Sequence, residues 1–179
     1  AEATEAHDFT VKVDVRGLAP GQSYYYRFQT TDRQSPVGVT RTLPEGSIDS
    51  VRLAVVSCAN YPAGYFNVYG EISKQNDLDA VVHLGDYIYE YSSDSGSYAA
   101  QDAQALGRTF SEDNNLELIE LVDYRKRYAA YRADPDLQSL HARVPFIVVW
   151  DDHEVANDAW EEGAENHNEG EGDFTQRKL

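Results

Sequence analysis

Basic residues are scarce in this sequence, which has 15 Lys and Arg against 31 Asp and Glu and a formal net charge of -16. Nucleic acids and anionic membranes select surfaces with clustered Lys and Arg, so this balance argues against both as partners. The carboxylates suit solvated acidic loops or bound cations, and composition does not distinguish the two. No apolar run approaches the roughly 20 residues of a transmembrane helix. Since 41% of the residues are hydrophobic, we expect a globular protein with a packed core.

Cysteine is almost absent. Cys58 is the only one, so no disulfide can form within the chain. A lone cysteine is a buried filler, a reactive thiol or a metal ligand. Its position directly after a strand-like run favours a metal ligand. The sequence also lacks a Gly-rich phosphate loop of the Walker type, which argues against a nucleoside triphosphate hydrolase.

The first 44 residues have a β pattern. Residues 9–15 alternate between apolar and polar side chains, residues 17–21 contain the Gly and Pro of a turn, and residues 24–28 resume the strand pattern. The segment from Leu18 to Tyr24 resembles the tyrosine corner of fibronectin type III and related immunoglobulin-like domains. Such a sandwich has about seven strands, so we expect residues 1–44 to be its C-terminal part and residues 45–50 to be a linker.

The chain begins with Ala1 rather than Met, and no charged-then-apolar signal follows. We therefore expect the natural N-terminus, and any export signal, to lie outside this sequence.

Three apolar runs predict strands of an α/β fold, at residues 51–56, 80–84 and 146–150. Between the first two, apolar side chains at helical spacing in residues 65–75 predict a helix whose face contains Tyr65, Phe66, Val68, Tyr69 and Ile72. Strand, helix and strand form a βαβ unit, which indicates a parallel sheet. The composition of residues 80–84 predicts a strand covered on both faces.

The residues that follow these runs share side chains able to bind metals or exchange protons: Cys58, Asp86, Tyr89, Asp152 and His153. In open α/β sheets, ligands bind outside the carboxyl ends of the strands. We therefore predict a site at one sheet edge. His83 lies inside a strand, so we interpret it as structural.

A long excursion at residues 91–115 is expected to contain a short helix near residues 99–106. Residues 116–132 predict an amphipathic helix with a basic face formed by Arg125, Lys126, Arg127 and Arg132. One reading makes a basic residue a clamp for an anionic substrate. The other, which we favour, is a solvated face on which Asp123 pairs with Arg127.

The dipeptide Asp134-Pro135 is a typical helix start and predicts a helix at residues 135–142. Residues 161–173 are rich in Glu, Gly and Asn and predict a mobile acidic loop. A calcium loop is conceivable here, although the spacing of an EF-hand is not met.

Five blocks in order between residues 57 and 160 are similar to those of the PhoD-like alkaline phosphatases, in the metallophosphoesterase superfamily that contains the purple acid phosphatases. The blocks are Ser57-Cys58, 85–90 (Gly-Asp-Tyr-Ile-Tyr-Glu), 123–128, 134–142 and 150–157 (Trp-Asp-Asp-His-Glu-Val-Ala-Asn). The resemblance implies that residues 51–179 are the N-terminal part of a catalytic domain with a four-layer αββα sandwich. A truncated immunoglobulin-like domain at residues 1–44 also agrees with that family.

The resemblance further implies a metal site of two or more ions. Asp86 would bridge two metals, and Cys58 and Tyr89 would bind Fe³⁺. Asp152 stands where the wider superfamily has Asn, and its extra charge suits the Ca²⁺ implied at the second position. Asn157 is a further oxygen donor for the same site.

The implied activity is metal-assisted hydrolysis of phosphate esters, either phosphomonoesters or phosphodiesters, by a secreted, periplasmic or cell-surface enzyme. His153 would contact the substrate phosphate or the leaving group as general acid or hydrogen-bond donor, with Asp86 as the other catalytic residue. The family has further Asp and His ligands downstream of residue 179, so we expect the site in this chain to be incomplete.

Two alternatives belong to other classes. A non-enzymatic, calcium-dependent surface protein would account for the β module and the acidic loops. A different α/β hydrolase would use Cys58 as nucleophile, which requires a low-pKa thiolate and a nearby base.

Overall fold

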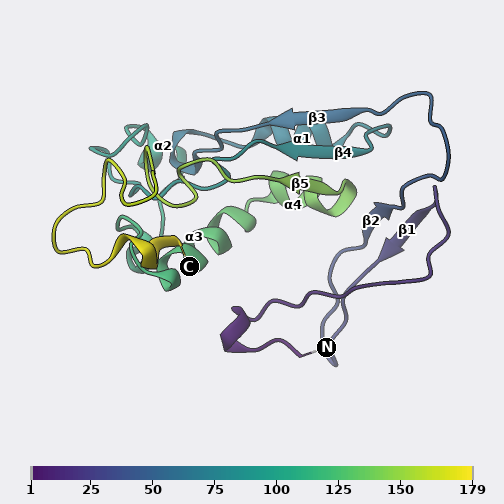
Figure 1. Ribbon diagram of the computed structural model, residues 1–179, viewed down its shortest axis with the longest axis horizontal. Coiled ribbons are helices and arrows are strands. Elements are labelled where there is room, and N and C mark those ends of the chain that lie inside the picture. Colours follow the sequence, from purple (N-terminus) through teal and green to yellow (C-terminus); the bar gives the residue numbers. More distant parts are fainter. Residues whose placement is uncertain (1, 179) are drawn as a thin grey trace. The chain divides into compact units, whose positions relative to one another are not determined.

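The structure is a computed structural model that describes residues 2–178 (Figure 1). The chain divides into two compact units, Ala1–Val51 and Arg52–Leu179. The division lies next to residues 45–50, where the sequence predicted a linker and where the described backbone forms neither helix nor strand.

The first unit contains a short 3₁₀ helix, η1 (Glu5–His7), and an antiparallel pair of strands, β1 (Ser23–Tyr26) and β2 (Gly38–Arg41). The strand predicted at residues 9–15 is wrong, because no described strand pairs with this segment and a strand needs a hydrogen-bonded neighbour. Two apolar residues of the segment are accordingly exposed, Val13 at 55% and Val15 at 62%.

The turn before β1 has the local geometry of a tyrosine corner. The backbone N–H of Ala19 donates to the hydroxyl of Tyr24 over 2.8 Å, and the carbonyl of Ala19 accepts from Thr42 Oγ1 over 2.7 Å. A tyrosine that bonds to backbone a few residues upstream defines this corner. The sequence pattern therefore predicted this local contact correctly.

The second unit is built on a parallel sheet in the order β3-β4-β5, formed by β3 (Leu53–Val56), β4 (Ala80–His83) and β5 (Phe146–Val148). All three strands were predicted, and the parallel arrangement is confirmed. One cross-strand row of the sheet contains Val55, Val82 and Ile147, and the adjacent row contains Ala54, Val81 and Phe146. Because side chains alternate along a strand, these two rows face opposite sides of the sheet.

One face of this sheet is covered and the other is open in the described part of the chain. Val81 is fully buried in the main hydrophobic core, whereas Val55 and Ile147 are 61% and 56% exposed. The expectation that the central strand is covered on both faces is therefore not met, because no described element packs on the second face. The covered face contacts side chains of α1 (Asn67–Ser73) and α4 (Pro135–Arg143).

Helices α1 and α4 pack closely against each other. A Cβ at Gly70 would lie 2.5 Å from Asp136 Oδ1, so any larger residue would require the Asp136 side chain to move. Tyr69 is buried as predicted, but Tyr65 and Val68 are 59% and 65% exposed, which corrects the expected apolar face. The shorter α1 presents only one narrow stripe to the core.

Helix α4 begins as predicted. The carboxylate of Asp134 accepts from the backbone N–H groups of Asp136 and Leu137 over 3.0 and 3.1 Å, and Pro135 occupies the first position. This satisfies two of the donors that a helix start leaves unpaired. The other Asp134 oxygen accepts from Arg108 over 2.6 Å in a buried ion pair.

Helix α3 (Leu121–Arg132) starts later than the predicted residue 116. The carboxylate of Asp123 accepts from the N–H of Glu120 over 3.1 Å, and this cap places the helix start at Leu121. Leu116 lies outside the helix and is 77% exposed. Apolar spacing alone did not reveal where the backbone turns.

Both readings of the basic face are wrong for Arg127, whose side chain is completely buried. Its Nη1 donates to the carbonyls of Tyr89 and Tyr91, and its Nη2 donates to those of Asn114 and Leu116, over 2.5 to 3.0 Å. Burial lowers the pKa of Arg127 to about 10, so the guanidinium stays charged at neutral pH. It joins the segment after β4 to the segment before α3.

The remaining elements are short, namely η2 (Tyr61–Ala63), α2 (Ala103–Leu106), η3 (Glu112–Asn114) and η4 (Phe174–Lys178). Helix α2 confirms the short helix predicted in the long excursion. Residues 161–173 form turns, and no described helix is long and apolar enough to cross a membrane.

Candidate metal centre

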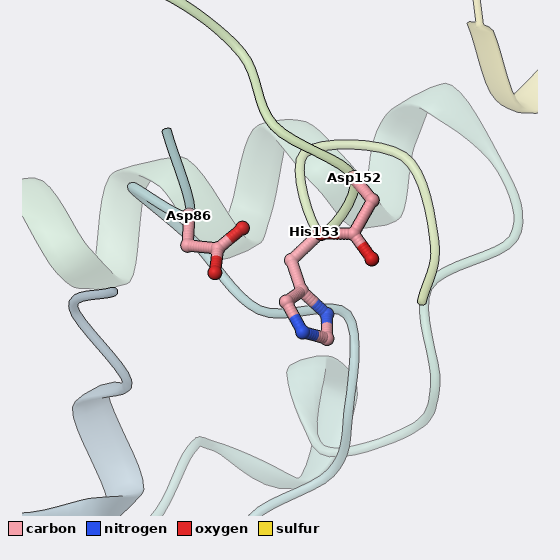
Figure 2. Close-up of side chains that lie close together, drawn as sticks. All are labelled: Asp86, Asp152 and His153. Carbon is pink, nitrogen blue, oxygen red and sulfur yellow. The ribbon is translucent and has the colours of Figure 1, made fainter. Parts of the chain in front are cut away.

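Three potential metal ligands meet at the carboxyl edge of the parallel sheet. Asp86 follows β4, and Asp152 and His153 follow β5 (Figure 2). One ligand atom from each residue lies within 4.8 Å of the other two. The carboxyl ends of neighbouring parallel strands bring them together, although they are up to 67 positions apart in the sequence.

The backbone turns sharply at two adjacent strand ends. Cys58, just after β3, has φ 59°, and Asp86, just after β4, has φ 53°, both in the left-handed region. A non-glycine residue in this region costs on the order of 1 kcal/mol or more. The two turns are bonded to each other, since Cys58 N–H donates to Gly85 over 3.2 Å and Ala59 N–H donates to Asp86 over 2.9 Å.

A buried carboxylate, Glu154, bonds to the backbone at both later strand ends. Its Oε2 accepts from Asp86 N–H over 3.1 Å and from Asp151 N–H over 2.8 Å, and its Oε1 accepts from Tyr87 N–H. Burial raises the pKa of Glu154, and the three backbone hydrogen bonds only partly oppose this rise. Glu154 thereby fixes the turn that carries Asp86 relative to the turn that carries Asp152.

The Asp86 carboxylate is buried and only half satisfied. Tyr89 donates its hydroxyl to Asp86 Oδ2 over 3.1 Å, while Asp86 Oδ1 has no hydrogen-bond partner among the described residues. A buried carboxylate oxygen without a partner is costly unless a cation compensates it. This unpartnered oxygen is the observation that best fits a metal ion.

Tyr89 lies beside Asp86. Burial, followed by the charge and hydrogen bond of Asp86, raises the pKa of Tyr89 well above its ordinary value. A phenolate at Tyr89 therefore requires a cation in contact with its oxygen. Cys58 itself is exposed and lies outside the group of three ligands.

His153 is buried between aromatic and acidic neighbours. Its ring stacks on Tyr89 with centroids 4.2 Å apart, and its Nδ1 lies 2.8 Å from Glu90 Oε2. Burial lowers the pKa of His153, but the hydrogen bond and charge of Glu90, with the charges of Asp86 and Asp152, outweigh it and raise the pKa overall. The other ring nitrogen, Nε2, makes no hydrogen bond to a described residue.

The side chain of Asn157 has a partner of its own in the structure. Asn157 Nδ2 donates to Glu165, and its backbone N–H donates to Glu90 over 2.7 Å. A metal role for Asn157 remains a prediction, as does the role of Cys58. The residues of the group fit one cation, since two carboxylates and an imidazole nitrogen are common metal donors.

Sequence reasoning missed three buried charged residues that surround the candidate centre, namely Glu90, Arg127 and Glu154. All three lie in the blocks that carried the family resemblance, so their positions were visible. Their roles were hidden because Arg127 and Glu154 bond to backbone groups and Glu90 bonds to residues more than 60 positions away, and a sequence does not show either kind of contact. His83 is structural as expected, with Nε2 3.1 Å from the Tyr69 hydroxyl and a pKa that burial lowers to about 4.

Two family models match the chain. The model for the PhoD-like phosphatase matches residues 53–179, and the model for the PhoD-like phosphatase N-terminal domain matches residues 1–44.

Individual proteins agree with these matches. Alkaline phosphatase D of Bacillus subtilis (strain 168) is 43% identical over 159 residues, which cover 88% of this chain and 26% of that protein. A solved structure described as the structure of PhoD is 38% identical, with a TM-score of 0.81, and the match covers 98% of this chain and 32% of the solved chain. The chain thus spans about a quarter to a third of the length of these relatives.

Proposed function

Because the chain belongs to the PhoD-like phosphatase family, we propose that it is part of a metal-dependent enzyme that hydrolyses phosphate esters. The observation that carries the proposal is the buried, unpartnered Oδ1 of Asp86 beside Asp152 and His153 at the sheet edge. A site of this composition is costly without a cation, and with one it can bind a phosphate group.

In the proposed centre, Asp86 would be shared by two ions, and its two oxygens have different surroundings. Oδ2 accepts from Tyr89 and Oδ1 is unpartnered. We assign Tyr89 and Cys58 to Fe³⁺, because phenolate and thiolate are charged donors suited to a transition metal, and Asp152 to Ca²⁺. Asn157 would join the site only after releasing Glu165.

When bound, the ions supply Lewis acidity and a water nucleophile at working pH. The protein residues hold and orient the reactants. When it carries protons on both ring nitrogens, His153 donates a hydrogen bond or a proton from Nε2 to the phosphate or the leaving group, while Tyr89 stacks on the ring and restricts its rotation. Asp86 and Asp152 provide no attraction of their own for a phosphate, because all three groups are anionic.

Substrate binding is therefore expected to depend on the metal. The proposed substrates are phosphomonoesters or phosphodiesters, and the proposed location is outside the cytoplasm, as the family resemblance implies.

Two finer features of the fold belong to the same proposal. The open row of Val55 and Ile147 supports a second sheet packed on this face, as in a four-layer αββα sandwich. The corner formed by Tyr24 and Ala19 supports an immunoglobulin-like sandwich around β1 and β2, with residues 1–44 as one domain and 51–179 as part of another.

The test uses the intact protein purified without chelators. Elemental analysis should find iron and calcium, and the protein should hydrolyse p-nitrophenyl phosphate or bis-p-nitrophenyl phosphate, with chelation removing the activity. Asp86→Asn should lower both metal content and hydrolysis. Asp151→Asn is the matched control, because the exposed Asp151 carboxylate makes no contact within the group.

A different result would change the class of the protein. Calcium binding without iron or phosphatase activity would favour the non-enzymatic surface protein. Rapid alkylation of Cys58 with metal-independent hydrolysis would favour a cysteine nucleophile.

A further inference from the structure

Glu90 is a completely buried carboxylate that receives three hydrogen bonds from different segments. Its Oε2 accepts from His153 Nδ1 over 2.8 Å, and its Oε1 accepts from Asn157 N–H over 2.7 Å and from Asn166 Nδ2 over 2.9 Å. Three donors compensate the burial of one negative charge. None of these bonds is local in the sequence, so the folded chain assembles the arrangement.

This arrangement determines which nitrogen of His153 carries a proton. An ionised carboxylate only accepts hydrogen bonds, so Nδ1 must be the protonated nitrogen beside Glu90. Nε2 is then the nitrogen left for a ligand, and it has no partner among the described residues. In metal and acyl-transfer sites, a carboxylate that bonds one histidine nitrogen sets the role of the other.

The backbone that carries Glu90 is held on both sides. Arg127 Nη1 donates to the carbonyl of Tyr89 and to the carbonyl of Tyr91, the residues immediately before and after Glu90. A fixed backbone on each side leaves the Glu90 side chain little freedom to follow a displaced histidine. The ring of His153 is accordingly held by Glu90 at Nδ1 and by Tyr89 through stacking.

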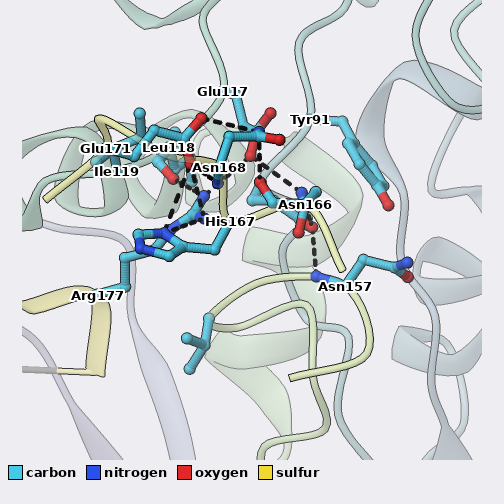
Figure 3. Close-up of polar contacts among 12 residues, drawn as sticks. Tyr91, Glu117, Leu118, Ile119, Asn157, Asn166, His167, Asn168, Glu171 and Arg177 are labelled. Atoms are coloured by element: carbon cyan, nitrogen blue, oxygen red, sulfur yellow. Dashed lines mark hydrogen bonds and ion pairs between the residues drawn. The ribbon is translucent and has the colours of Figure 1, made fainter. Parts of the chain in front are cut away.

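The acidic segment near the end of the chain completes this support (Figure 3). Asn166 Nδ2 bridges Glu90 and Glu117, donating to one oxygen of each over 2.9 and 3.0 Å. Arg177, whose side chain is 1% exposed, forms an ion pair with Glu117 over 3.1 Å. An amide donor and a guanidinium therefore hold together two carboxylates that would otherwise repel each other.

We propose that Glu90 is the positioning residue of His153, that it fixes the Nδ1–H form of the ring, and that Asn166 holds Glu90 in place for this purpose. The inference rests on the proposed function, in which His153 Nε2 contacts the phosphate or its leaving group. It assigns a role to the acidic segment, which the sequence suggested only as a mobile loop or a calcium loop.

The first experiment compares Glu90→Gln with the wild type in the intact protein. Gln has one acceptor oxygen and one donor group, so one of the three donors must face another donor. If the oxygen stays with Asn157 and Asn166, the amide donates to His153 Nδ1 and shifts the ring to the Nε2–H form. Nδ1 then cannot carry a proton as well, and a ring with its only proton on Nε2 is a much weaker acid than the doubly protonated ring. We expect kcat to fall about 10- to 100-fold with KM changed less than about twofold.

The second readout does not depend on activity. Long-range ¹H–¹⁵N spectra of the protein labelled at histidine nitrogens identify the tautomer, with His153 assigned from His153→Gln. Wild type and Glu90→Asp should have the proton on Nδ1, because both keep a carboxylate, and Glu90→Gln should move it toward Nε2. Asn166→Ala should lower kcat by about 3- to 10-fold, since Glu90 retains two donors.

Glu169→Gln is the matched control, because it removes the same charge from an exposed residue of the same segment. It should change neither readout. If Glu90→Gln keeps the Nδ1–H form, the inference is overturned, whether kcat is retained or is lost together with thermal stability. If the tautomer shifts but the wild type hydrolyses no phosphate ester, positioning by Glu90 is supported and the proposed function fails.

Discussion

The sheet edge buries charged side chains, whereas the N-terminal unit exposes apolar ones. At the sheet edge, buried charged side chains such as Glu90, Arg127 and Glu154 bond to backbone groups from several segments. In the N-terminal unit, the strands β1 and β2 pair with each other and leave apolar side chains such as Val15 and Tyr25 exposed, at 62% and 75%. A two-stranded ribbon has little core of its own, whereas a parallel sheet with helices on one face has one.

The comparison teaches where substitutions should matter. At the sheet edge a change in one side chain leaves several buried groups without partners, which is costly. In the N-terminal unit a similar change removes few contacts. The following predictions use the intact protein and test this difference, from the largest expected effect to the smallest.

The largest effect is expected for Asp86. Asp86→Ala removes both oxygens of the proposed bridge and should lower kcat/KM at least about 1,000-fold, because no neighbouring group can replace a ligand at this strand end. Asp86→Asn tolerates the left-handed backbone and keeps an acceptor for Tyr89, so it should fold normally while metal content falls. Near-normal turnover and metal content in both variants would remove Asp86 from the centre.

Arg127→Lys should have the largest effect on stability, about 3 kcal/mol. A lysine ammonium is a compact charge that cannot reach four carbonyls in a fork, and it loses the contact of the guanidinium with the Phe110 ring, 3.9 Å away. Urea unfolding measures the change. Lys126→Ala is the neighbouring control and should cost less than about 1 kcal/mol, because its pair with Asp113 is exposed. An equal loss of stability in the two variants would mean that the buried contacts of Arg127 stabilise the fold no more than an exposed ion pair does.

Glu154→Gln should destabilise by about 2 kcal/mol, since one of the three N–H groups that bond to this carboxylate loses its acceptor. The same change should weaken metal binding about 10- to 100-fold, because the turns carrying Asp86 and Asp152 are no longer tied together. Metal titration against a competing chelator measures the second effect. Loss of stability with unchanged metal affinity would limit Glu154 to a structural role.

Tyr89→Phe should change stability little, about 1 kcal/mol, because the ring still stacks on His153 and only one hydrogen bond is lost. If Tyr89 binds ferric iron, the protein should have a visible charge-transfer band that this substitution weakens or shifts. Cys58→Ser should perturb the band too, since a hydroxyl ionises far less readily than a thiol. If the protein contains iron and its visible spectrum is the same in both variants, the two residues are excluded as iron ligands.

The smallest effect is expected for Val15→Ser, which should stay within about 0.5 kcal/mol of the wild type because the side chain is exposed. Val81→Ala, at a fully buried position in β4, should cost about 2 kcal/mol by comparison. A large cost for Val15→Ser in urea unfolding would indicate that further chain covers this segment, as an immunoglobulin-like sandwich would require.

Much of the fold could be predicted from local patterns. The apolar runs located β3, β4 and β5, the Asp134-Pro135 pair located the start of α4, and the tyrosine corner at Tyr24 was recognised. The prediction of a strand at residues 9–15 was wrong. Alternating apolar and polar side chains show that a segment can form a strand, but it does so only where a neighbouring strand pairs with it. The start of α3 was misplaced because the cap at Asp123 overrides apolar spacing.

The sequence by itself determined the parallel sheet and the kinds of side chain at its carboxyl edge. Both depend on short stretches of the chain, namely the apolar runs that form the strands and the residues that follow them. Only the tertiary structure decided that Asp86, Asp152 and His153 form one group while Asn157 turns to Glu165. It alone showed that Glu90 and Arg127 are buried supports rather than surface charges. The physical reason is that Arg127 bonds to backbone carbonyls, which every residue carries, and Glu90 bonds to groups far away in the sequence. Only folding brings either kind of partner within hydrogen-bond distance.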